Sequence, residues 1–210
     1  MKKLMLIILL LSTKTFSADN SLENIQRIWA QAMYTYSDNK TLEVLRDLEK
    51  KLYDETNIEL VTWRGIIRSS LAKYEGGLKA LKLVKLAKKD FEAVIDNDES
   101  VLSGSALTSL GTLYFMVPSW PVSFGNNDKA EYYLKKALAL NPNGIDPNYF
   151  YAQYLMSKRD YKSALKYLDK AKLAKIRKNR PIAENGRRKE IDLAIQESMN
   201  KMKGDIILNR

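Results

Sequence analysis

The sequence predicts an all-α fold in which pairs of antiparallel helices stack on one another. Apolar residues recur at spacings of three and four along most of the 210 residues, and no useful length of chain alternates apolar and polar residues as a strand does. A small, large and small apolar set also returns after 34 residues, at Ala130, Leu134 and Ala137 and again at Ala164, Leu168 and Ala171. A fixed period of this length indicates repeated helical hairpins, because each hairpin buries its apolar face against its neighbours.

The first predicted pair consists of two amphipathic segments, Leu22 to Tyr36 and Thr41 to Tyr53, with Asp38 and Asn39 as turn and capping residues. The second pair turns at Gly76 and Gly77, since two consecutive glycines punctuate helices. Its second helix repeats the small, large and small spacing at Ala87, Phe91 and Val94.

The 34-residue period is that of the tetratricopeptide motif. Leu110 with Gly111, and then Tyr114, stand where the first helix of that motif has Leu-Gly and Tyr, and Pro142 stands at its closing proline. Trp63 takes the place of the motif's first-helix tryptophan in the preceding pair. The third predicted pair therefore joins the Leu110 helix to the helix that begins near residue 128.

A fourth pair opens at Asp146, which we expect to cap a helix from Asn148 to Ser157, followed by a helix that begins near Asp160. A last amphipathic helix from about Ala183 to Lys203 is expected to cover the open end of the stack, and Gly204 to end it. The predicted fold is thus a tetratricopeptide-like, right-handed superhelix of about four antiparallel helix pairs and a C-terminal capping helix, in a single domain over residues 19–210.

The N-terminus predicts export. Lys2 and Lys3 precede the unbroken apolar run from Leu4 to Leu11, the pattern of a secretory signal peptide over residues 1–18. Cleavage is expected after Ala18 or Ser17, and a buried N-terminal helix is the alternative. The run would cover only about 12 Å of a bilayer core about 30 Å thick, so it cannot span. No transmembrane segment is expected in the mature chain, which we place in the periplasm or outside the cell.

The amino-acid composition excludes several classes of function. The chain has neither Cys nor His, which excludes thiol catalysis, histidine acid–base chemistry and the commonest transition-metal ligands. We therefore expect no catalytic residue, metal or cofactor. Without residues 1–18 the chain keeps 32 basic and 25 acidic residues, a net charge of +7, which favours anionic partners or simply aids solubility. The lysines are spread out, with no compact basic run interleaved with aromatics, so nucleic acid is not an expected partner.

The clearest departure from a regular repeat is the segment Val117-Pro-Ser-Trp-Pro-Val-Ser-Phe-Gly125, about seven residues longer than the motif needs. Two prolines stiffen it. Trp120 and Phe124 must either pack onto a neighbouring helix or present an apolar surface to a partner. Both alternatives stay open for both side chains.

The inner face of such a stack is lined by the first helix of each pair. The register places cations, hydroxyl groups and an amide there, at Arg64, Arg68, Ser105, Thr108, Thr112, Tyr149 and Gln153. This set could hold a peptide backbone, or an anionic ligand through the forked guanidinium groups of the two arginines, and the alternative is a merely solvated face. On an outer face, Lys79, Lys82, Lys85 and Lys89 run along one helix, where they keep it solvated or contact an anionic membrane weakly.

About half the chain, from Leu110 to Glu190, resembles a group of small exported bacterial tetratricopeptide proteins that are largely uncharacterised. The resemblance rests on Leu110-Gly-Thr-Leu-Tyr114, Val117-Pro-Ser-Trp-Pro121, Phe124-Gly125, Lys129-Ala-Glu131, Leu138-Ala-Leu-Asn-Pro142, Gly144-Ile-Asp146, Asn148-Tyr-Phe-Tyr151, Arg180-Pro181 and Gly186-Arg-Arg188. A more distant similarity, to the periplasmic tetratricopeptide component that accompanies some TRAP-type transporters, implies a role beside a solute-binding protein. This chain lacks the lipidation cysteine.

These observations predict an exported, non-enzymatic adaptor or scaffold that binds a protein or peptide partner in the cell envelope through its concave groove and the Trp120 loop. The alternative is a periplasmic accessory of a transport system that binds a small anionic solute, with Arg64 and Arg68 holding a carboxylate.

Overall fold

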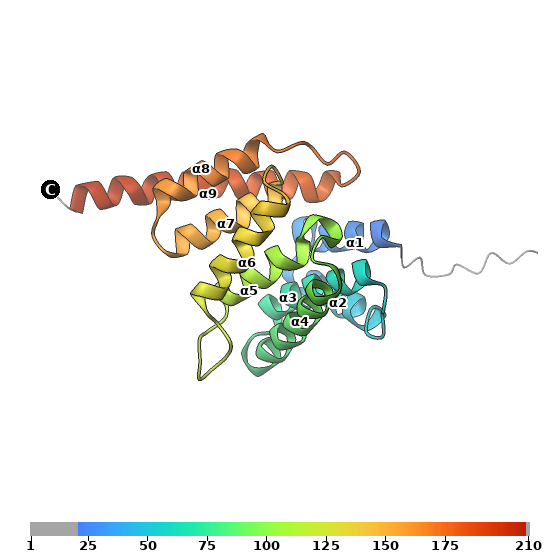
Figure 1. The fold of residues 1–210 in the computed structure, drawn as a ribbon. Helices are drawn as coiled ribbons and strands as arrows, with labels where there is room; N and C mark the ends of the chain where they lie inside the picture. Colours follow the sequence, from blue (N-terminus) through green and yellow to red (C-terminus); the bar gives the residue numbers. More distant parts are fainter. Residues whose placement is uncertain (1–20, 209–210) are drawn as a thin grey trace, which may run out of the picture.

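The computed structural model describes residues 21–208, with side chains as far as residue 204, and this range contains nine α-helices, one 3₁₀ turn and no strand (Figure 1). The predicted signal peptide, residues 1–18, lies outside the described residues and stays a prediction. None of the helices within the described range is both long and apolar enough to cross a bilayer.

The helices form four consecutive pairs and a final long helix, which confirms the predicted all-α repeat fold. The pairs are α1 (Leu22–Thr35) with α2 (Asp38–Lys51), α3 (Ile58–Glu75) with α4 (Gly77–Asp98), α5 (Ser105–Met116) with α6 (Asn127–Leu140), and α7 (Ile145–Ser157) with α8 (Tyr161–Leu173); α9 runs over Pro181–Leu208.

The recurring small and large residues form the contacts within the pairs. All six of them are completely buried, namely Ala130, Leu134, Ala137, Ala164, Leu168 and Ala171. The motif glycine on α5 is needed for the same reason, because a Cβ atom on Gly111 would lie 2.7 Å from Cγ of Leu134. The helices of this pair approach as closely as the sequence pattern predicts.

Helix α9 does more than cover the last pair. It packs on α8, as expected, and its N-terminal part also packs on α1, so that it returns from the end of the stack to its beginning (Figure 1). The contact with α1 is close, since a Cβ atom on Gly186 would lie 2.4 Å from the Tyr34 ring. Gly204 does not end this helix, which continues to Leu208. A glycine in a helix costs only about 1 kcal/mol relative to alanine, and no proline follows it.

Two predicted caps are also wrong. Ser37, not Asp38 or Asn39, precedes α2 as its N-cap, and Gly144 precedes α7. Asp146 lies inside the first turn of α7, because Ile145 before it is already helical and buried. The carboxylate of Asp146 is left for partners elsewhere in the fold.

Candidate functional site

The loop between α5 and α6 is held in one shape by its own backbone. The Gly125 amide donates to the Pro118 carbonyl over 3.0 Å, and the Asn126 amide donates to the Tyr114 carbonyl over 2.8 Å. Gly125 admits no side chain, since a Cβ atom there would lie 2.1 Å from the Val117 carbonyl oxygen. The loop projects from one end of the α5–α6 pair (Figure 1).

The two aromatic side chains of this loop have different environments. The Phe124 ring packs edge-to-face on Tyr114, with 5.5 Å between ring centroids, and the Lys88 ammonium lies 5.8 Å from it. Trp120, in contrast, is 85% exposed, and Val122 beside it is 56% exposed. Of the two predicted alternatives, Phe124 packs onto a neighbouring helix, and Trp120 presents an apolar surface to the solvent.

Arg64 and Arg68 point into the protein. Arg64 donates to Asp90 through Nη2 over 2.8 Å and, through Nη1, to the backbone carbonyls of Leu52, Tyr53 and Glu55. Arg68 is buried and donates to Asp90 over 2.7 Å and to Glu49 over 3.0 Å. Asp90 is itself buried, so these ion pairs join α2, α3 and α4. The guanidinium forks that could hold a ligand carboxylate already hold protein carboxylates, an arrangement that favours a structural role.

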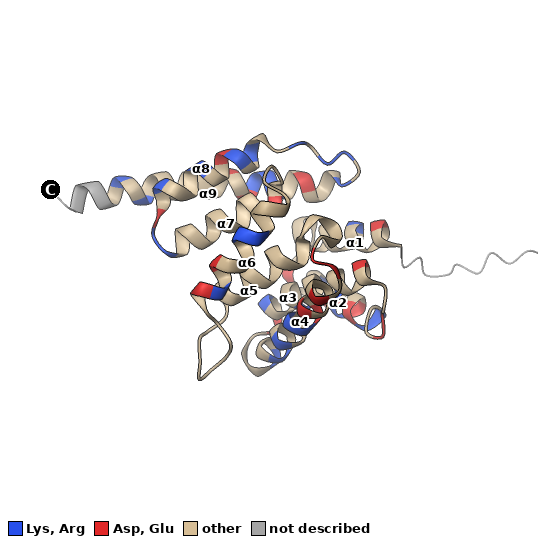
Figure 2. Cartoon of the chain, viewed as in Figure 1, with Lys and Arg blue, Asp and Glu red and all other residues tan. Residues whose placement is uncertain are grey.

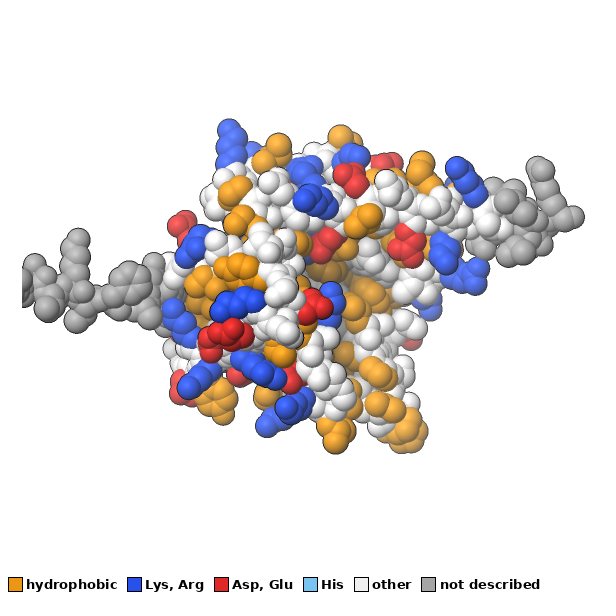
Figure 3. Space-filling view, turned by 180° about the vertical axis from the view of Figure 1, so that it is seen from behind, with side chains coloured by type: hydrophobic (Ala, Val, Ile, Leu, Met, Phe, Trp, Pro, Cys, Tyr) orange, Lys and Arg blue, Asp and Glu red, His pale blue; other side chains and the backbone are white. Residues whose placement is uncertain are grey.

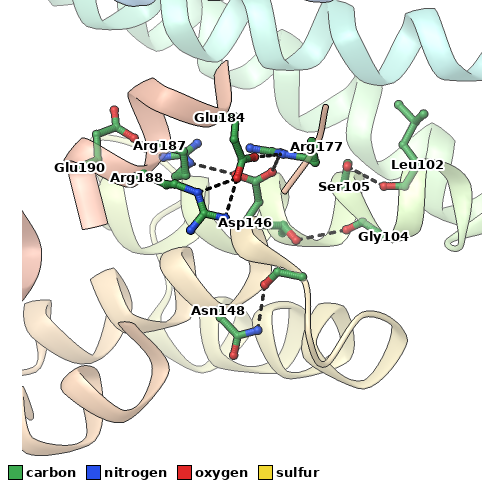
Figure 4. Close-up of polar contacts among 12 residues, drawn as sticks. Leu102, Gly104, Ser105, Asp146, Asn148, Arg177, Glu184, Arg187, Arg188 and Glu190 are labelled. Atoms are coloured by element: carbon green, nitrogen blue, oxygen red, sulfur yellow. Dashed lines mark hydrogen bonds and ion pairs between the residues drawn. The ribbon is translucent and has the colours of Figure 1, made fainter. Parts of the chain in front are cut away.

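The hydroxyl groups among the remaining inner-face candidates bond to backbone carbonyls of α5 and of the turn before it. Thr108 is buried and donates to the Gly104 carbonyl, while Thr112 donates to the Thr108 carbonyl within the same helix. The Ser105 hydroxyl donates its proton to the nearby carbonyl of Leu102 (Figure 4). Gln153 is half-buried on α7. Because these hydroxyl groups already donate to nearby backbone carbonyls, they could only accept hydrogen bonds from a partner.

Tyr149 is buried under an arginine from the last helix. The guanidinium of Arg187 lies 4.4 Å from the Tyr149 ring centroid and 4.6 Å from that of Phe150. Helix α9 therefore covers the part of the inner face that α7 contributes. The sequence predicts Tyr149 on this face, but it does not reveal that another helix lies over it.

Beside Tyr149 lies an ion-pair cluster that the sequence patterns do not predict. Arg187 Nε donates to Asp146 over 2.9 Å, and Arg177 Nη1 donates to the other carboxylate oxygen over 2.6 Å (Figure 4). Arg177 and Arg188 in turn each donate to Glu184 over 2.8 Å. These contacts join α7, the segment before α9 and α9 itself. One signal was available, because Arg187 and Glu184 stand four and seven residues before Ile191, on the buried stripe of α9, and a buried charge implies a partner.

The charges of this cluster stabilise one another. Burial alone would raise the pKa of Asp146, but Arg187, Arg177 and Arg180 outweigh it and lower that pKa below its usual value. Burial opposes the charged form of Arg187 as well, and Asp146 is the foremost group that raises its pKa. Burial also raises the pKa of Tyr34, which donates to Glu190 from α1. The lowered pKa of Asp146 and the raised pKa of Arg187 keep this pair charged at neutral pH, and the contacts of the cluster fasten α9 against both ends of the stack.

Arg180 differs from its neighbours. Its Nε atom is buried without a hydrogen-bond partner, and its guanidinium lies 5.2 Å from the Trp63 ring centroid. Burial, together with the nearby charge of Arg177, lowers its pKa. Among the described residues it forms no ion pair, and it lines a cavity of about 380 Å³ between the starts of α1 and α9. No three carboxylates in the described part of the chain gather to hold a metal ion.

Residues 122–175 match a family model described as tetratricopeptide repeat, and this range contains α6, α7 and α8. A search among curated proteins found no match. The chain thus contains a tetratricopeptide repeat, the kind of repeat that usually mediates protein interactions and is typically a non-enzymatic scaffold.

Proposed function

We propose, on the premise that this is a tetratricopeptide-repeat protein, that it is an exported, non-enzymatic adaptor that binds a protein partner through the loop from Val117 to Gly125. The observation that carries this proposal is the exposure of Trp120, which is 85% accessible on a loop closed by its own backbone hydrogen bonds. Tryptophan is the residue type most enriched among the contacts that dominate binding energy.

The contacts that hold the loop in one shape support binding. A partner that meets a flexible loop must order it, at a cost of about 0.5–1.5 kcal/mol for each immobilised side chain. Here Phe124 anchors one side of the loop on Tyr114, and Gly125 fixes its closure against Val117. Burial of Trp120 by a partner would therefore contribute to affinity with little loss to ordering.

The inner face has a smaller part in this proposal. Arg187 covers Tyr149, and Arg64 and Arg68 are bound to Asp90. A peptide in the predicted concave groove would have to displace α9 from α7 or break the buried pairs of Asp90. A partner on the loop needs neither change.

The exported setting is part of the proposal and rests on the signal-peptide pattern of residues 1–18. Its test is the N-terminal sequence of the protein recovered from the envelope fraction of its source cells. A chain that starts at Ala18 or Asp19 supports export, and a chain that starts at Met1 in the cytosolic fraction contradicts it.

The experiment for the adaptor role is affinity capture from envelope extracts with the mature protein, with Trp120→Ala and a control variant in parallel. The control is Leu173→Ala, because Leu173 is equally exposed, at 86%, but lies at the end of α8. We expect one envelope protein that the wild type and the control capture and the Trp120 variant does not. Capture that is equal in all three, or absent from all three, contradicts the proposal.

A second candidate function, binding of a small anionic solute, is favoured by Arg180 rather than by Arg64 and Arg68. Arg180 forms no close ion pair among the described residues and lines the cavity of about 380 Å³. A thermal-shift screen of small carboxylates and phosphates tests it. Stabilisation that Arg180→Met abolishes supports this function, and no stabilisation by any anion at millimolar concentration rules it out.

A further inference from the structure

The Trp120 loop is one wall of a groove whose other wall is α4. Val122 of the loop faces α4 across a hollow of about 500 Å³. The α4 wall contributes three leucines and three lysines, namely Leu78, Leu81, Leu86, Lys82, Lys85 and Lys89. The groove is distinct from the predicted concave face, because α4 is the second helix of its pair.

The apolar part of the groove is open to solvent. Leu78 is 84% exposed and Val122 is 56% exposed, and Trp120 stands two residues from Val122. Figure 3 shows hydrophobic side chains that protrude along the lower edge of the molecule, where the 117–125 loop and the turn between α3 and α4 lie in Figure 1. Apolar side chains gathered in this way mark interaction surfaces.

The charge of the groove has one sign. From Gly77 to Lys89, α4 carries five lysines and no Asp or Glu, and Figure 2 shows this basic stretch along the helix. Two of these lysines are already paired, Lys79 with Glu75 and Lys88 with Glu92. The three that line the groove, Lys82, Lys85 and Lys89, are exposed and form no ion pair within the described part of the chain. The groove therefore presents three unneutralised cations beside an apolar floor.

We propose that this groove binds an acidic amphipathic segment of the protein partner, with apolar side chains against Leu78, Leu81 and Val122 and with Asp or Glu side chains facing the lysines. This inference rests on the proposed adaptor function and adds the chemistry of the partner. Lys82 and Lys89 are seven residues apart, about 10.5 Å along the helix, which matches about two turns of a helical partner. A segment that lies between α4 and the loop would contact Val122 and the α4 side chains together.

The test uses a synthetic probe, a fluorescently labelled peptide of about six helical turns with leucines at spacings of three and four and glutamates at the other positions. Fluorescence anisotropy measures its binding to the mature protein. A second peptide with lysine in place of every glutamate controls for apolar contact alone. Anionic phosphatidylglycerol vesicles, assayed by co-sedimentation, measure the bilayer as an occupant.

The variant that tests the charge is Lys82→Gln, Lys85→Gln, Lys89→Gln. Its control removes three exposed lysines far along the chain, as Lys166→Gln, Lys175→Gln, Lys178→Gln, and so keeps the net charge matched. We expect the groove variant to bind the glutamate peptide about tenfold more weakly and the control to bind it like the wild type. We expect the lysine peptide to bind the wild-type protein at least as weakly as the glutamate peptide binds the groove variant.

Three results overturn the inference. These are equal binding of the glutamate and lysine peptides, equal weakening by the groove and control variants, and vesicle binding that depends on Lys82, Lys85 and Lys89 while the glutamate peptide does not bind. In each case, capture that still depends on Trp120 would leave the adaptor function intact. If the peptide results are as expected but capture of an envelope protein does not depend on Trp120, the adaptor function is contradicted instead.

Discussion

Trp120 and Phe124 lie four residues apart in one loop, yet Phe124 packs on Tyr114 with ring centroids 5.5 Å apart, while Trp120 is 85% exposed. The sequence predicts that this loop is longer than a regular repeat needs, and that each aromatic side chain either packs on a helix or contacts a partner. The structure separates them, so that one ring holds the loop and the other is available for contact. This difference makes the roles of the two residues separable by mutation.

Trp120→Ala should leave the fold as stable as the wild type. An exposed side chain away from any cap or ion pair changes the free energy of unfolding by less than about 0.5 kcal/mol. Urea unfolding followed by circular dichroism measures this. A loss of stability well beyond that range would mean that the Trp120 ring packs on the protein in solution.

Phe124→Ala should destabilise the protein by about 1–2 kcal/mol. The ring is partly buried against Tyr114, and truncation removes both buried area and an aromatic contact. The same unfolding experiment measures the loss, with Trp120→Ala as its control. Equal stabilities of the two variants would contradict the anchoring role of Phe124.

Asp146→Asn should lower stability at neutral pH by about 2 kcal/mol, because Arg177 and Arg187 lose their shared carboxylate. The estimate is below that for a fully buried pair, since the Asp146 side chain is 35% exposed. Asp169→Asn removes an exposed carboxylate on α8 and should change stability little.

The same carboxylate gives a pH dependence of defined sign. The pKa of Asp146 is lower in the folded protein than in the unfolded chain, so its contribution is complete above about pH 4 and is lost as pH falls through the folded pKa. The difference in unfolding free energy between wild type and Asp146→Asn should therefore shrink as the pH falls from about 4 through the folded pKa. A difference that stays constant over this range would show that the carboxylate charge does not contribute.

Gly186→Ala should destabilise the contact between α9 and α1, by about 1–3 kcal/mol, because the added Cβ meets the Tyr34 ring at 2.4 Å. A double-mutant cycle with Tyr34→Ala tests the mechanism. Gly186→Ala should lower the free energy of unfolding much less in the Tyr34→Ala background, where the ring is absent. Equal costs in both backgrounds would contradict a close approach of these helices.

The parts of the fold that sequence predicts well depend on local spacing. Ala130, Leu134 and Ala137 define a helix face through positions within seven residues, and all three are completely buried. Gly111 and the glycine pair at Gly76 likewise mark features of the backbone near them. These signals need no knowledge of what lies across the molecule.

The parts that sequence does not predict depend on long-range packing. Arg64 and Arg68 face Asp90, which lies 26 and 22 residues away, and their helix position alone gives no sign of it. Asp146 reads as a cap from its local context, but Arg187, 41 residues later, binds it. The position of α9 between α1 and α8 decides which inner-face residues stay accessible, and that position follows from contacts of the whole stack.

The most direct test of the central claim is a photo-crosslinking experiment in source cells. A photoreactive amino acid is placed at position 120 or, as a control of equal exposure, at position 173. We expect position 120 to crosslink to one envelope protein, identified by mass spectrometry, and position 173 not to crosslink to it. No crosslink from position 120, or the same products from both positions, would contradict the claim.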